Sequence, residues 1–143
     1  MDEPKLTPAE MQHAQQLLHD YAPAREAMAV LEHHHGNVST SVGELWEREV
    51  PPEQRSFDVS RESLWSVMRR VLRDEVCGDE GFLAKVTAYT RQPEDAALFT
   101  GVVIYLLELT MLPISPAIAT IAVLYIVKVG LRVFCEYTEP GEG

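Results

Sequence analysis

Three consecutive histidines, His33, His34 and His35, are the most conspicuous candidates for chemistry in this chain. Metal ligation from one helix requires histidines three or four residues apart, so that both imidazoles share a face. Consecutive histidines point in three directions, so a histidine from another helix would have to complete a site. Histidines in the last turn of a helix also interact favourably with its C-terminus. We therefore predict no metal ligands and assign the three histidines, with Trp46, to a candidate partner surface.

The two cysteines, Cys77 and Cys135, are the other reactive side chains. Each falls within or at the end of a helical pattern, and two cysteines make no disulfide framework, so we predict buried free thiols. Nothing around Cys77 matches a nucleophile signature. The sequence also contains no glycine-rich phosphate loop and no His-Glu-x-x-His motif. We therefore predict that the protein is not an enzyme, has no catalytic residues and binds no cofactor.

The longest apolar stretch of the chain is residues 96–135, and it must be buried either in protein or in a bilayer. Between Asp95 and Lys128 its only formal charge is Glu108, and it is interrupted once, by Pro113-Ile114-Ser115-Pro116. Two apolar helical segments joined by so short a break form an antiparallel hairpin. Three polar residues of this hairpin are candidate functional residues: Glu108, Lys128 and Arg132.

The hairpin has two interpretations. A membrane span needs about 20 mainly apolar residues. Residues 96–114 meet that requirement, and Lys128 could snorkel from the second segment. The basic residues lie outside the apolar turn, at Lys85 and Arg91 before the hairpin and at Lys128 and Arg132 near its end, so both ends would be cytoplasmic. In the alternative, the hairpin is the buried core of a soluble bundle and Glu108 is a carboxylate at its edge. One row of the second segment could then face water: Thr120, Leu124, Lys128 and Arg132.

Before the hairpin, the sequence predicts helices and no strands. Thr7 to Glu10 form a capping box with proline at the first helical position, and the apolar spacing continues to Tyr21. A second helix spans about 24–34, with Gly36 suited to a left-handed C-cap. A third begins after Asn37. These three helices occupy residues 1–49.

The residues Glu26-Ala27-Met28-Ala29-Val30-Leu31, then Gly36-Asn37-Val38, then Val42 and Leu45-Trp46 resemble the ubiquitin-associated (UBA) fold and its bacterial relatives. The resemblance covers about 5–49 and implies a three-helix partner-binding module. The Met-Gly-Phe/Tyr loop that the family uses for ubiquitin is absent, and residues 20–23 take its place, so the resemblance implies the scaffold and not ubiquitin binding. A generic three-helix cap is the alternative interpretation.

A proline-containing polar linker at 50–57 separates this module from a helical region at 58–143. Asp58 or Ser60 would cap an amphipathic helix that ends at Gly78 and carries Trp65 at the margin of its apolar stripe. A shorter helix follows from Asp79 to about residue 91. The whole chain is predicted to be all-α, with seven helices: the N-terminal module, a middle amphipathic pair and the apolar hairpin.

Composition narrows the classes of partner. The net charge is −10 over 143 residues, which disfavours nucleic acid and electrostatic docking to anionic lipid. The N-terminus has no apolar core of a signal peptide, so we expect a cytoplasmic location, with the inner membrane included if the hairpin inserts. The layout resembles that of small accessory or adaptor proteins of bacterial signalling and conflict systems.

Two functions follow from this layout. The first is a non-enzymatic adaptor or effector that binds a protein partner through the N-terminal module and inserts in a membrane, or oligomerises, through the hairpin. The alternative is a wholly soluble all-α oligomeric scaffold in which the hairpin is the core. Both predict a protein partner or a homo-oligomer.

Overall fold

A computed structural model of the chain describes residues 5–49, 61–110 and 114–137. These residues form eight helices and one isolated β-bridge, between Lys5 and Asn37, so the predicted all-α class is confirmed. The helices are α1 (Pro8–Leu17), α2 (Ala22–His33), α3 (Val38–Glu49), α4 (Arg61–Val76), α5 (Glu80–Arg91), α6 (Ala96–Leu109), α7 (Pro116–Val129) and α8 (Leu131–Tyr137).

Most of the helix starts are specified by local sequence. Thr7 Oγ1 accepts from the Glu10 amide and Glu10 Oε1 accepts from the Thr7 amide, which completes the predicted capping box of α1. Asp79, Asp95 and Ser115 each cap the amide three residues ahead. The cap at Ser115 and the proline at the start of α7 were both expected. The predicted caps at residues 58 and 60 lie outside the described residues.

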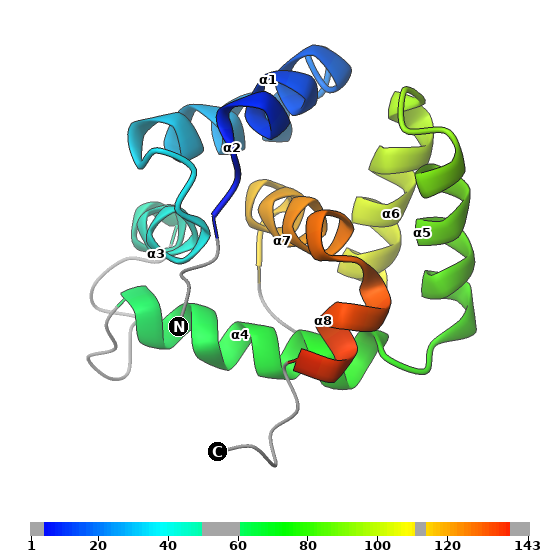
Figure 1. Ribbon diagram of the computed structural model, residues 1–143. Coiled ribbons are helices and arrows are strands. Elements are labelled where there is room, and N and C mark those ends of the chain that lie inside the picture. The colour runs from blue at the N-terminus through cyan, green and yellow to red at the C-terminus, as the bar shows by residue number, and fades with distance from the viewer. Residues whose placement is uncertain (1–4, 50–60, 111–113, 138–143) are drawn as a thin grey trace.

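The central element of the fold is α7. In Figure 1 it lies in the middle of the molecule, with α1 and α2 on one side, α5 and α6 on another, and α3, α4 and α8 completing the enclosure. Every residue from 117 to 123 is buried, and Ile126 is buried one turn later. A helix apolar on all faces requires such an all-round covering. The hairpin is therefore packed inside protein.

The N-terminal helices share this core. Helices α2 and α3 both contact α7, and α3 packs along α4. Glu49 at the end of α3 accepts a 2.6 Å hydrogen bond from Ser115 Oγ at the start of α7. The buried apolar residues form one continuous cluster from Leu6 to Phe134. The predicted linker at 50–57 lies outside the described residues.

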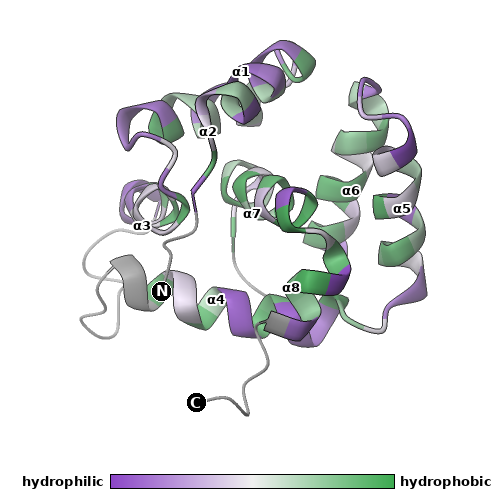
Figure 2. Ribbon diagram, viewed as in Figure 1, coloured by the Kyte–Doolittle hydropathy of each residue, from purple (hydrophilic) through white to green (hydrophobic). Residues whose placement is uncertain are grey.

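The two arms of the hairpin are shorter than predicted. Helix α6 ends at Leu109 and α7 at Val129, each with 14 residues, or about 21 Å of helix against roughly 30 Å of hydrocarbon. Figure 2 shows the apolar colouring concentrated on these arms, in the interior of the molecule. Among the described residues, no helix is long and apolar enough to cross a bilayer. The stretch 96–114, predicted as long enough to span a membrane, is therefore replaced by the shorter helix α6, Ala96–Leu109.

The last helix was not predicted. Gly130, with a φ of 90°, ends α7, and the chain then turns into α8, whose Phe134 is buried. The sequence pattern predicts one segment that runs to residue 135, because apolar residues continue on both sides of Gly130. This helix explains why eight helices are observed where seven were expected.

The prediction of free thiols is wrong. Cys77, just after α4, and Cys135, in α8, form a disulfide with their Cα atoms 5.9 Å apart. The bond joins positions 58 residues apart in the sequence. The two cysteines come together because α8 turns back toward the end of α4, as Figure 1 shows, and that turn depends on the unpredicted break at Gly130.

Candidate functional site

The polar residues of the hairpin lie at the surface and in separate places. Lys128 Nζ donates to both carboxylate oxygens of Glu10, at 2.9 and 3.1 Å, so it pairs with α1. Arg132 pairs with Glu136 at 3.4 Å along α8. Glu108 is exposed on α6. The expected water-facing row is partly wrong, because Thr120 is fully buried and donates to the Pro116 carbonyl.

The three histidines separate at the end of α2. His35 is exposed in a left-handed conformation, with a φ of 56°, and Gly36 follows with a φ of 85°. A Cβ on Gly36 would lie 2.2 Å from the Leu6 carbonyl oxygen, so this turn requires glycine. His34 is half-buried against α3, and the side chain of His33 is 75% exposed.

Glu44 of α3 is the partner that brings two of these histidines together. His34 Nε2 lies 2.5 Å from Glu44 Oε1, and His33 Nδ1 lies 3.8 Å from the same oxygen. Arg48 Nη2 donates to the other oxygen at 2.5 Å. The hydrogen bond from His34, followed by that from Arg48, lowers the pKa of Glu44 against the opposing effect of burial. Sequence reasoning missed Glu44, although the short turn between α2 and α3 places the adjoining helical turns side by side.

Trp46 does not join the histidines in one exposed surface. It is partly buried and packs against the hydrophobic core. Of the four residues of the candidate partner surface, only His33 and His35 are exposed.

A shallow groove of about 310 Å³ lies between α1 and α2, and sequence reasoning did not identify it. We call it the α1–α2 groove. Leu18, Ala24 and Met28 line it and are themselves buried, so they form an apolar floor. The remaining lining residues are Gln15, His19, Arg25, Ala29 and Glu32.

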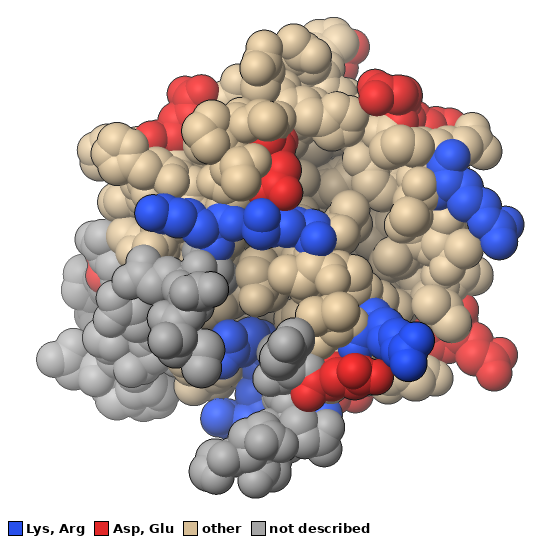
Figure 3. All heavy atoms as spheres, viewed as in Figure 1, with Lys and Arg blue, Asp and Glu red and all other residues tan. Residues whose placement is uncertain are grey.

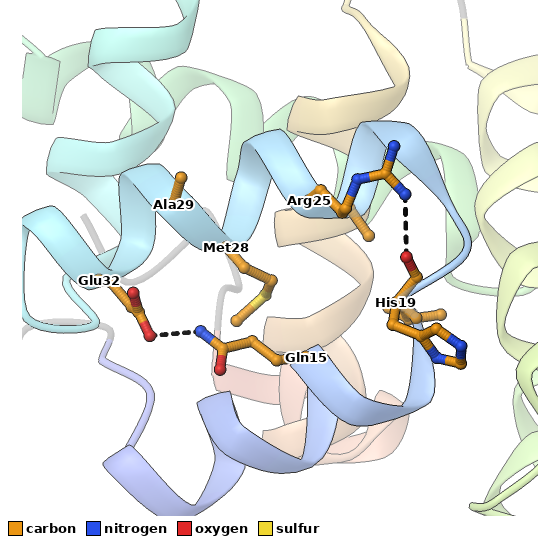
Figure 4. Close-up of a pocket in the computed structure, with 8 residues that line it drawn as sticks. Gln15, His19, Arg25, Met28, Ala29 and Glu32 are labelled. Carbon is orange, nitrogen blue, oxygen red and sulfur yellow. Dashed lines mark hydrogen bonds between the residues drawn. The ribbon is translucent and has the colours of Figure 1, made fainter.

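Polar side chains mark the two ends of this groove (Figure 4). At one end Gln15 of α1 donates to Glu32 of α2. At the other, Arg25 Nη1 donates to the His19 carbonyl at 2.9 Å. This bond takes one of the five N–H donors of the guanidinium. The carboxylate of Glu32 therefore lies at one end of the apolar floor, and the guanidinium of Arg25 lies at the other.

The charged side chains on one face of the molecule can be followed in Figure 3. On the face shown in Figure 3, acidic and basic side chains occur in small separate groups with uncharged surface between them. This face offers no continuous basic tract of the kind that tracks a phosphate backbone.

The disulfide removes both cysteines from consideration as nucleophiles. Searches against protein-family models, curated proteins and solved structures found no match to this chain.

Proposed function

We propose that this chain is a non-enzymatic, partner-binding helical protein of the adaptor type, and that the α1–α2 groove receives an extended segment of a protein partner. The observation that carries the proposal is the apolar floor of this groove, bracketed by Arg25 at one end and Glu32 at the other. The resemblance of residues 5–49 to UBA-like modules supports a binding role for the same helices. The net charge of −10 favours a protein over a nucleic acid as the partner.

The spacing of the two charges defines the chemistry of the partner. Arg25 and Glu32 are seven residues apart on α2, a rise of roughly 10 Å along the helix. An extended chain covers this distance in about three residues. Only side chains an even number of residues apart share one face of an extended chain, and a spacing of four is the nearest that leaves one such side chain between the two charges. The complementary segment therefore carries an acidic and a basic residue four positions apart, with an apolar side chain midway between them for the floor formed by Leu18 and Met28.

In this proposal the hairpin has a structural role. Its inner residues, such as Leu106 and Ile121, are fully buried, so membrane insertion would require α7 to leave the core and expose them. The large exposed apolar residues, Val67, Leu83, Ile104 and Val133, lie on four different helices. Single exposed residues of this kind are ordinary. Sizing of the full-length protein, before and after carbonate washing of membranes, tests oligomerisation and insertion directly.

A display library of short random peptides, panned on the full-length protein, tests the groove. We expect enrichment of peptides with an acidic and a basic residue flanking an apolar one. Met28→Lys places a charge on the floor and should abolish their binding. The double variant Arg25→Glu, Glu32→Arg should bind peptides in which the order of the two charges is reversed.

The matched control is Arg132→Glu, Glu136→Arg. It exchanges the charges of another exposed pair, on α8, and should leave peptide selection unchanged. Circular dichroism and thermal melting verify that each variant is folded. The proposal is wrong if no charge pattern is enriched, or if the enriched peptides bind the groove variants and the wild type equally.

A further inference from the structure

The turn between α2 and α3 gathers side chains with the donor atoms of a metal site. One ring nitrogen of His33, one of His34 and a carboxylate oxygen of Glu44 all lie within 4.8 Å of one another. The histidines come from the last turn of α2 and the glutamate from the second turn of α3. The end of α2 and the start of α3 therefore supply the three donor atoms, and the short Gly36-Asn37 connection holds these two helices together.

The two separations from Glu44 lie on either side of the spacing that a tetrahedral ion requires. Zn²⁺ bonds to nitrogen and oxygen at about 2.0–2.1 Å, which places tetrahedral ligands roughly 3.3 Å apart. The distances from Glu44 Oε1 to His34 Nε2 and His33 Nδ1 are 2.5 and 3.8 Å, one below this value and one above it. Each distance would have to change by less than about 1 Å to reach this spacing. His33 has room for such a change, because its side chain is 75% exposed.

We propose that His33, His34 and Glu44 form a binding site for a divalent transition metal ion, with Zn²⁺ as the best match. Imidazole and carboxylate ligands suit this ion, and a water molecule completes the coordination from the open side of His33. This site does not depend on the α1–α2 groove.

The surroundings of Glu44 fit the role of a ligand. Its second oxygen accepts from Arg48, which also approaches Glu26 at 4.0 Å. Hydrogen bonds to the outer atom of a ligating carboxylate orient such ligands in metal sites. Glu26 and Glu44 together outweigh the single positive charge of Arg48. The side chains of His34 and Glu44 are each only 17% exposed, so two of the three ligands are already held in place.

A metal ion bound to His33, His34 and Glu44 would connect the end of α2 to α3. Because this turn connects two of the three helices in the N-terminal module, the bound ion should stabilise the folded chain against heat. The apo and metal-loaded proteins would then differ in melting temperature as well as in metal content.

Titration with Zn²⁺ alone tests the site, using full-length protein purified without a polyhistidine tag and stripped with a chelator. Isothermal calorimetry should show one equivalent bound, and Co²⁺ should give the visible absorption of a tetrahedral complex. His33→Gln removes an exposed ligand without disturbing the core. It should weaken binding by at least about tenfold, the lower bound seen when even an outer-shell partner of a metal site is lost. Glu44→Gln should do the same.

His35→Asn is the matched control. It changes the adjacent histidine to a residue that tolerates the same left-handed backbone, and it should leave the affinity unchanged. The proposal is overturned if the wild type binds no Zn²⁺, or if His33→Gln and His35→Asn bind it equally. Binding that persists in His33→Gln and disappears in His19→Gln would also overturn it, because the metal would then occupy another place.

Discussion

Lys128 Nζ lies 2.9 Å from Glu10 Oε1, so the last turn of the central helix α7 is ion-paired with the first turn of α1. The same glutamate oxygen accepts the Thr7 amide at 2.8 Å. Glu10 therefore completes the cap of its own helix and connects that helix to the hairpin. The lysine that could have snorkelled toward a membrane surface instead has a partner within the fold.

The first prediction concerns the two roles of Glu10. Glu10→Gln keeps a side chain that can accept the Thr7 amide and loses only the ion pair, so it should cost less than about 1 kcal/mol. Glu10→Ala loses both the hydrogen bond from the Thr7 amide and the ion pair with Lys128. It should lower the free energy of unfolding by about 1 kcal/mol more than Glu10→Gln does. Urea unfolding of the two variants measures the difference. In a Lys128→Met background, the effect of Glu10→Gln should nearly vanish, and an undiminished effect would show that the pair contributes nothing.

The ion pair between Glu10 and Lys128 should make the free energy of unfolding depend on pH. Burial acts to raise the pKa of Glu10, but hydrogen bonds from Thr7 and Lys128 outweigh it, and the net shift is downward. A lowered pKa stabilises the fold above the ordinary pKa of glutamate and loses that contribution as the pH falls through the lowered value. The difference in unfolding free energy between wild type and Lys128→Met should therefore be largest at neutral pH and shrink in acid. A difference that grows in acid would contradict this assignment.

A second prediction concerns Gly81 in the first turn of α5. Glycine to alanine on a helix usually stabilises it. Here a Cβ would lie 2.3 Å from Tyr105 Oη, which donates to Asp79 Oδ1 at 2.7 Å. Gly81→Ala should therefore destabilise the protein, because the tyrosine must move and its hydrogen bond is lost.

Tyr105→Phe removes the clashing oxygen, so it is the matched background for this test. The cost of Gly81→Ala should be smaller in Tyr105→Phe than in the wild type, as measured by thermal unfolding of the four proteins. Equal costs in the two backgrounds would mean that the tyrosine is not the obstacle.

A third prediction compares two residues of α6. Leu106 is fully buried, whereas Ile104, two positions earlier, is 49% exposed. Leu106→Ala should cost about 2–5 kcal/mol as a cavity in the core, and Ile104→Ala well under half of that. Chemical unfolding measures both. Similar costs would contradict the orientation of α6, and two negligible costs in the presence of lipid would favour a hairpin inserted in a membrane.

The last prediction concerns the disulfide. Replacing Cys77 and Cys135 by alanine should lower the free energy of unfolding by about 2–4 kcal/mol, because the unfolded chain regains the freedom of a long loop. The wild type should show no reactive thiol until it is unfolded with a reductant. Free thiols in the native protein purified without a reductant would contradict the bond.

The parts of the fold specified by neighbouring residues could be predicted from the sequence. Thr7 with Glu10, and Ser115 with Pro116, specify helix starts through contacts three residues apart, and Gly36 marks a turn through its own backbone. The burial of Trp65, 2% exposed, likewise followed from its position beside an apolar stripe.

The missed features depend on how one helix lies against another, which the pattern within a single helix does not show. The disulfide joins residues 58 apart, and it needs the turn at Gly130, whose apolar neighbours concealed the break. Glu44 meets His34 only because α3 turns back beside α2. The α1–α2 groove is a property of two helices together, so no single stretch of sequence shows it.

The bond between Cys77 and Cys135 closes a covalent ring that contains α5, α6 and α7, while α1 to α3 lie outside it. A protease cut after the exposed Arg91, the last residue of α5, would leave both fragments attached to each other. The cut chain would migrate as one species until a reductant separated it into two. A cut before Cys77 would release the N-terminal helices from any covalent tie, and only noncovalent packing would then retain them. The central helix α7 shares with α5 and α6 the ring that a single cleavage cannot detach.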